Sequence, residues 1–210
     1  MNPLSQKKAF HTALVISPPV SEWAQIQEIR KFYDTAYSRW MPHLNMSFPF
    51  VIEQDFDIAS SILQEALKDF DPFKIELKTL GSFSFEKDSV IWVAPDVNDE
   101  INKLEQIILK NFPFCDELVK KSPEGFKAHM TLGRFDEKIV AKKLNEFQEK
   151  WKTVTFTVNE LYMIFRQDSE SPFFIIKTMH FKNAEGESNR EKINKEMQNF
   201  VKEFYQTNFF

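Results

Sequence analysis

The order of apolar repeats constrains the fold of this 210-residue chain more than any other feature. Alternation of apolar and polar residues predicts β-strands, and apolar residues three or four positions apart predict α-helices. In the first half of the chain these patterns predict the order strand, helix, strand, helix, strand. The predicted segments are 9–16, 20–37, 43–51, 57–70 and 73–78.

The second half repeats this order, with predicted segments at 89–94, 97–111, 126–135, 137–150 and 153–166. A further strand at 173–181 is expected to pair with 153–166 as a hairpin. The repeat predicts an α+β fold of duplicated β-α-β-α-β units, with antiparallel sheets around a central groove. We expect the two lobes at roughly 9–85 and 86–181. Because no linker rich in Gly, Ser or Pro separates them, they should form one domain over 1–186.

The tail, residues 187–210, carries an amphipathic helical pattern. Its apolar positions are Ile193, Met197, Phe200, Val201 and Phe204. Charged and amide side chains fill the opposite face. We predict a C-terminal helix packed on the domain. A partner or membrane surface is the alternative, and the mixed charge of the polar face argues against a membrane.

Charge and composition exclude several classes of function. The formal net charge of −4 removes the strongly basic surface that duplex DNA requires. With 4 Gly in the chain, a glycine-rich phosphate loop is not expected. The single cysteine, Cys115, can form no internal disulfide, which suits a reducing compartment. The apolar runs are too short to span a bilayer. We expect a cytoplasmic protein, with a nuclear location as the alternative, that acts as a monomer without a membrane partner.

Each half of the chain has one histidine on its second predicted strand. Because side chains alternate along a strand, His43 shares a face with Asn45 and Ser47. In the same way His129 shares a face with Thr131. If a pseudo-twofold axis relates the two halves, both imidazoles reach one cleft.

Two imidazoles beside one substrate suit acid–base catalysis. Their ordinary pKa of about 6.5 lets one ring be neutral and the other protonated near neutral pH. The neutral ring accepts a proton from a nucleophile, and the charged ring gives one to a leaving oxygen. This chemistry needs no covalent intermediate, and no group of His, Cys and acidic residues has metal-ligand spacing. We therefore expect neither a metal nor another cofactor.

The segments 43–45 (His-Leu-Asn) and 129–131 (His-Met-Thr) resemble the paired His-x-Thr/Ser motifs of the two-histidine phosphoesterases. That family includes the 2′-5′ RNA ligase-like and cyclic phosphodiesterase proteins. The resemblance extends over roughly 9–181. Flanking segments that support it are 39–42, 48–50, 112–116, 125–126 and 133–134.

The resemblance implies a bilobal fold whose motifs line a central groove. It implies metal-independent hydrolysis of a 2′,3′-cyclic phosphate RNA end, or of a related cyclic or 2′-5′ nucleotide. The expected partner is therefore an RNA end or a small nucleotide. The resemblance also implies His129 as the base and His43 as the acid, with Thr131 and Asn45 holding phosphoryl oxygens.

Asn45 departs from the family pattern, which has Thr or Ser at this position. An amide can donate a hydrogen bond to a phosphoryl oxygen, but it is longer than a hydroxyl. Two alternatives to the enzyme therefore stay open. One is a catalytically weak nucleotide- or RNA-binding module with the same groove. The other is an interaction protein that uses its C-terminal helix.

Five further residues are candidate substrate contacts. Ser47 offers a hydroxyl beside the first motif. Arg134 and Arg166 are interpreted as phosphate contacts, with surface cations as the alternative. Trp40 and Phe50 are interpreted as stacking platforms for a base, with packing between the lobes as the alternative.

Overall fold

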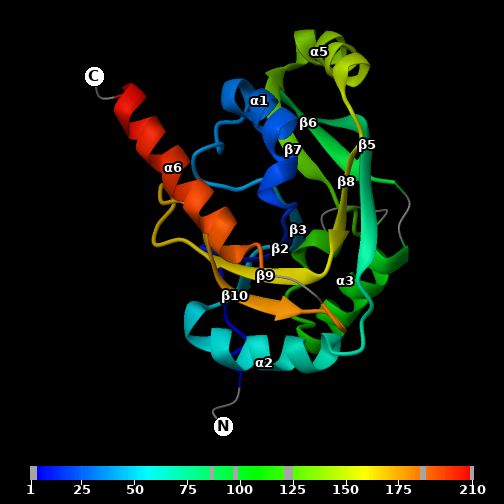
Figure 1. The fold of residues 1–210 in the computed structure, drawn as a ribbon, viewed down its shortest axis with the longest axis vertical. Coiled ribbons are helices and arrows are strands. Elements are labelled where there is room, and N and C mark those ends of the chain that lie inside the picture. The colour runs from blue at the N-terminus through cyan, green and yellow to red at the C-terminus, as the bar shows by residue number, and fades with distance from the viewer. Residues whose placement is uncertain (1–3, 86–87, 97–98, 121–124, 185–187, 209–210) are drawn as a thin grey trace.

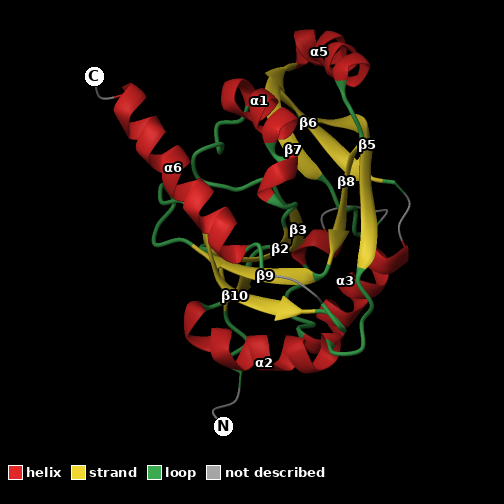
Figure 2. Cartoon of the chain, viewed as in Figure 1, coloured by secondary structure: helices red, strands yellow, loops and turns green. Residues whose placement is uncertain are grey.

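The computed structural model describes residues 4–85, 88–96, 99–120, 125–184 and 188–208. Within these ranges the chain forms two four-stranded antiparallel sheets with helices on their outer faces (Figure 1). The predicted α+β class is therefore confirmed. In Figure 2 the long strands of one sheet run vertically and those of the other run horizontally, so the two sheets cross steeply.

The first sheet has the strand order β10-β9-β2-β3, and every neighbouring pair is antiparallel. Its strands are β2 (Thr12–Ile16), β3 (Leu44–Ser47), β9 (Glu160–Phe165) and β10 (Phe174–His180). All five residues of β2 are buried, as expected for a strand with neighbours on both sides. β9 and β10 form the expected hairpin. A small separate pair joins β1 (Lys8–Ala9) to β4 (Phe50–Val51).

The second sheet has the order β7-β6-β5-β8 and is also antiparallel throughout. Its strands are β5 (Phe73–Ser84), β6 (Asp88–Pro95), β7 (Met130–Asp136) and β8 (Val154–Val158). At its start β5 alternates between buried and exposed residues, with Phe73, Ile75 and Leu77 inside. The period-two pattern of the sequence therefore identifies the inner face of this strand correctly.

The single long strand predicted at 153–166 is wrong. The chain forms β8 and β9 there, and these belong to different sheets. The break is at Asn159, whose carbonyl oxygen accepts a hydrogen bond from the backbone N–H of Phe181 at 3.0 Å. Both strands bury apolar and aromatic residues, so hydrophobic pattern alone cannot reveal that the chain changes sheet between them.

The sheets also divide differently from the two predicted lobes. β5 lies in the range 9–85, yet it pairs with β6 and β8 of the second sheet. β9 and β10 lie in the range 86–181, yet they complete the first sheet beside β2. The first sheet is therefore built from both ends of the chain, and the second from its middle.

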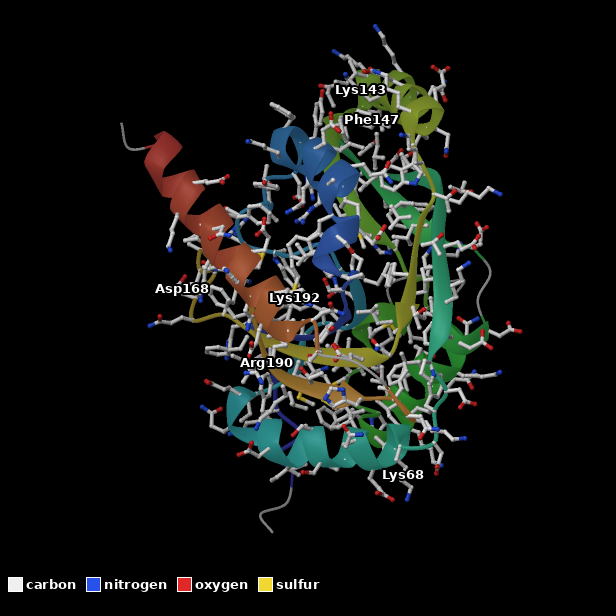
Figure 3. The ribbon with its side chains drawn as sticks, in the orientation of Figure 1. Lys68, Lys143, Phe147, Asp168, Arg190 and Lys192 are labelled. Atoms are coloured by element: carbon white, nitrogen blue, oxygen red, sulfur yellow. The ribbon has the colours of Figure 1, made fainter. Side chains whose placement is uncertain are left out.

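Helices cover both sheets. The α-helices among the described residues are α1 (Ala24–Tyr33), α2 (Phe56–Leu67), α3 (Asp99–Asn111), α4 (Glu117–Lys120), α5 (Glu137–Lys150) and α6 (Arg190–Asn208). α2 lies along β10, at the bottom of Figure 1. α1 and α5 meet over the second sheet, where Tyr33 contacts Phe135 and Phe147 at ring separations of 4.8 and 5.6 Å. Phe147 is labelled on α5 in Figure 3. No helix in the described part of the chain has the length and hydropathy to cross a membrane.

The first turns of α6 pack on the first sheet. Ile193 and Met197 are fully buried, and Phe200 stacks on Trp23 with 6.1 Å between ring centroids. The amide of Asn194 donates to the carbonyl of Ile175 at 3.0 Å and accepts from its N–H at 2.8 Å. The helix therefore satisfies backbone groups on β10 as well as burying apolar area. The side chain of Phe204 lies outside the described residues.

This packing predicts the effect of truncating the helix core. Met197→Ala should lower the free energy of unfolding by about 2–5 kcal/mol, because it leaves a cavity under α6. Lys195→Ala, on the exposed face of the same helix, is the matched control and should change it by less than about 0.5 kcal/mol. Urea denaturation monitors both variants. Equal stability of the two variants would contradict the packing of α6.

Candidate active site

The two histidines occupy matching positions in the two sheets. His43 lies one residue before β3, and His129 lies one residue before β7. Each of these strands is an edge strand, beside β2 in one sheet and β6 in the other. The motif strand therefore has an open edge in both sheets.

Both imidazoles are held by the same local contact. The Nδ1 atom of His43 lies 2.7 Å from the carbonyl oxygen of Met41, and Nδ1 of His129 lies 2.9 Å from the carbonyl oxygen of Lys127. A carbonyl oxygen can only accept, so Nδ1 carries the proton in each ring. The acceptor lies two residues earlier in the chain in both cases. With its proton on Nδ1, each neutral ring has Nε2 as its basic nitrogen.

Each imidazole also packs against a tryptophan. Trp40 stacks on His43 with 4.6 Å between centroids and 18° between planes. His129 contacts Trp92 at 6.3 Å and, edge to face, Phe83 at 5.0 Å. Trp92 in turn lies on Gly81, where a Cβ atom would come within 2.3 Å of the indole. A glycine on β5 is therefore needed for the ring that flanks the second histidine.

The pocket around the first motif also contains part of the second. His43, Asn45 and Thr131 line one pocket of about 250 Å³. His129 lines a second pocket, of about 360 Å³, together with Phe83 and Trp92. His129 and Thr131, one in each pocket, are separated in the sequence by the buried Met130. The structure thus brings three of the four motif residues into one pocket and puts the fourth beside it.

Asn45 contacts the reactive atom of the first imidazole. Its Nδ2 lies 3.1 Å from Nε2 of His43. Because the proton of this ring is on Nδ1, Nε2 is the acceptor and the amide is the donor. The Oδ1 atom of Asn45 is buried, with no hydrogen-bond partner among the described residues. The amide therefore stabilises the neutral form of His43 and leaves one acceptor unsatisfied.

The pKa of His43 is lowered to about 4. Burial is the largest cause, and the electrostatic effects of Arg30 and His129 add to it. The contact with the Met41 carbonyl and the charge of Asp34 act in the opposite direction. His43 is therefore neutral near pH 7 in this state of the protein. This disagrees with the acid role that the family resemblance gives His43, because an acid must start with a proton on Nε2.

A buried arginine, which the sequence patterns did not single out, supports the first motif. Arg30 on α1 is 2% exposed and pairs with Asp34 at 2.8 Å. It also donates to Gln27 Oε1 and to the carbonyl oxygen of Trp40, both at 2.9 Å. The guanidinium thus fixes the backbone of the residue whose ring stacks on His43. The sequence carries a signal for this role, because Arg30 lies four positions after Ile26, within the apolar helical pattern of 20–37.

Two predicted contact residues face the core. Ser47 is buried and donates to the carbonyl oxygen of Pro49 at 3.3 Å. The pairing of β2 with β3 shifts register between Asn45 and Ser47, so simple alternation fails there. Phe50 is fully buried and packs edge to face on Phe112 at 5.2 Å. The predictions of a pocket hydroxyl and a stacking platform at these two positions are wrong.

The other three predicted contacts lie in or near the site. Trp40 and Arg134 line the pocket with His43. Arg134 is already paired with Asp88 at 2.6 Å. Arg166 is not among the residues that line this pocket. In the described part of the chain, no three His, Cys, Asp or Glu side chains are grouped as metal ligands.

The fold and the paired motifs define a two-histidine phosphoesterase. The chain belongs to the 2′-5′ RNA ligase superfamily, whose family model matches residues 18–170. It is 24% identical, over 69% of its length and 96% of the relative, to a Staphylococcus haemolyticus protein named "Putative phosphoesterase SH1944". The motif resemblance to this family is therefore confirmed.

Solved structures share the fold at low sequence identity. Escherichia coli LigT complexed with phosphate gives a TM-score of 0.57 at 14% identity, covering 84% of this chain and 100% of LigT. LigT complexed with 3′-AMP gives 0.57 at 14% identity, covering 83% and 99%. The protein TT0787 of Thermus thermophilus gives 0.54 at 11% identity, covering 85% and 100%.

The lowered pKa of His43 predicts a pH-dependent stability. The unfolded chain protonates this ring at its ordinary pKa of about 6.5, while the folded protein protonates it only near pH 4. Between these values the unfolded state binds more protons, so the free energy of unfolding should fall as the pH is lowered. His43→Gln removes this contribution and should flatten the curve. Urea denaturation from pH 7 to 4 measures both proteins, and parallel curves would contradict the lowered pKa.

Proposed function

We propose that this protein hydrolyses 2′,3′-cyclic phosphates at RNA ends, or related cyclic or 2′-5′ nucleotides, without a metal. The observation that carries the proposal is the matched pair of histidines. Each ring donates from Nδ1 to the carbonyl two residues earlier, and each lies beside an edge strand that places Asn45 or Thr131 in one pocket. Two segments far apart in the sequence therefore hold a histidine by the same local contact.

The charge state of His43 favours one division of roles. His43 is neutral near pH 7, so its Nε2 can accept a proton from water as the water oxygen attacks phosphorus. His129, in its protonated form, gives a proton to the ribose oxygen that leaves. One P–O bond forms and one breaks, and the proton removed from water is matched by the proton given to the ribose. These roles are the reverse of those that the family resemblance implies.

Two neighbouring groups can hold the phosphoryl oxygens. The hydroxyl of Thr131 and the amide of Asn45 line the pocket and can both donate hydrogen bonds. When water takes its place at His43 Nε2, the Asn45 amide loses that acceptor and can turn to a phosphoryl oxygen. The LigT structures with phosphate and with 3′-AMP support a phosphorylated ligand for this fold.

A nucleotide- or RNA-binding module is the second candidate. The contact between the Asn45 amide and Nε2 of His43 favours it, because the amide occupies the atom that a general base needs. Under this candidate the groove holds a nucleotide but turns it over poorly. Both candidates predict that the protein binds a nucleotide, but only the first predicts that it hydrolyses the nucleotide efficiently.

Kinetics on a 2′,3′-cyclic nucleotide in excess chelator test the proposed reaction. His43→Ala and His129→Ala should each lower kcat by about 10²–10⁴-fold, because each removes one proton-transfer group. The double variant should be little worse than either single one, since the two rings act together. His180→Ala, an exposed histidine on β10, is the matched control and should keep wild-type kcat.

Three outcomes would contradict the proposal. Near-normal turnover by both folded single variants would remove the histidines from the reaction. Loss of wild-type activity in chelator, with recovery on adding a divalent ion, would contradict the metal-independent mechanism. Tight nucleotide binding by the wild-type protein without turnover would favour the binding module. In that case Asn45→Thr should raise the rate of hydrolysis if the Asn45 amide blocks Nε2 of His43.

A further inference from the structure

A row of aromatic rings leads from the first histidine to the protein surface. Trp40, which stacks on His43, meets Phe48 edge to face at 5.3 Å. Phe48 meets Phe10 in the same way at 5.8 Å. Trp40 and Phe48 line the pocket of His43, whereas Phe10 lies outside it and is 68% exposed. We call Trp40, Phe48 and Phe10 the aromatic row.

Two arginines gather at the outer end of the aromatic row. Arg166 donates to the carbonyl oxygen of Phe10 at 3.1 Å and to that of Ser169 at 2.8 Å. Arg39 donates to the same Ser169 carbonyl at 3.0 Å. Arg166 also lies over the ring of Phe173, with 4.7 Å from its guanidinium carbon to the ring centroid. We call Arg39 and Arg166 the arginine pair.

Two carboxylates interact with the arginine pair, and both belong to the loop between β9 and β10. Glu170 lies 3.7 Å from Arg39, and its side chain is 83% exposed. Asp168, labelled on the loop between β9 and β10 in Figure 3, accepts hydrogen bonds from the backbone N–H groups of Glu170 and Ser171, and its charge also acts on Arg166. The carbonyl oxygens that the two guanidiniums contact carry no net charge. Two guanidiniums and an exposed aromatic ring therefore occur together at the outer end of the aromatic row.

This combination is typical of single-stranded nucleic acid binding, in which bases stack on aromatic rings and guanidiniums contact phosphates. We propose that the aromatic row and the arginine pair bind the nucleotide that precedes the cyclic phosphate, so that the substrate is an oligoribonucleotide end. Phe10 would stack on the base, and Arg39 and Arg166 would contact the phosphate that joins the two nucleotides. This inference rests on the proposed function, because it takes the cyclic phosphate to lie at His43.

Two substrates that differ only in the preceding nucleotides test this subsite. One is a trinucleotide RNA ending in a 2′,3′-cyclic phosphate, and the other is the 2′,3′-cyclic mononucleotide with the same terminal base. Phe10→Ala should lower kcat/KM for the trinucleotide by about 5- to 160-fold, the effect of losing one stacked base. The mononucleotide should be unaffected, because Phe10 lies outside the pocket. Phe10→Trp should restore the trinucleotide rate.

Phe32→Ala is the matched control. Phe32 on α1 is 74% exposed and lines a separate groove between α1 and α5. Its removal should leave kcat/KM for both substrates unchanged. Arg166→Gln should weaken the trinucleotide alone, as Phe10→Ala does, because it removes a phosphate contact.

The failures of the two proposals are distinguishable. If wild-type protein hydrolyses both substrates and Phe10→Ala changes neither or both equally, the subsite is overturned and the proposed function stands. If wild-type protein hydrolyses neither, the proposed function fails. The subsite is then judged by binding of the trinucleotide with a 3′-phosphate, measured by calorimetry. Equal affinity of wild type and Phe10→Ala for this ligand would overturn it.

Discussion

The geometry of the first histidine depends on one buried cation. Arg30 lies inside the protein, where an unpaired charge would be strongly destabilising, and Asp34 is its counterion. The remaining donors are directed to Gln27 and to the backbone at Trp40. Helix α1 and the segment before β3 are thereby joined by hydrogen bonds as well as by packing. The backbone of Trp40, whose ring stacks on His43, is fixed by Arg30, and the charge of Arg30 adds to the effect of burial in lowering the pKa of His43.

The order of strands explains how two distant motifs meet. β9 returns to pair with β2, so the first sheet contains strands from both ends of the chain. The second sheet forms from the middle, with β7 at its edge. Each motif strand is therefore an edge strand, and α1 packs against β7 while leading into the first motif. Because α1 packs on β7, Arg30 and His43 lie close to Thr131, and all three residues line one pocket.

The periodicity of apolar residues predicted most of the strands and helices, because it indicates which face of each is buried. It could not predict that the chain changes sheet at Asn159, since strands of both sheets bury similar residues. Alternation placed Asn45 in the pocket correctly, but the register shift in β3 turned Ser47 to the core. Arg30 was not predicted because its role comes from tertiary contacts with Trp40. The neutral state of His43 could not be predicted either, because its lowered pKa depends on burial in the tertiary structure.

A crystal structure with a bound nucleoside 3′-monophosphate would show whether both histidine motifs hold one phosphoryl group. We predict phosphoryl oxygens within hydrogen-bonding distance of Nε2 of His43 and of Nε2 of His129, with the Thr131 hydroxyl donating to the phosphate. We also predict that the Asn45 amide leaves Nε2 of His43. A phosphate that contacts only one imidazole, or that binds outside the pocket of His43, would rule out a site shared by the two motifs.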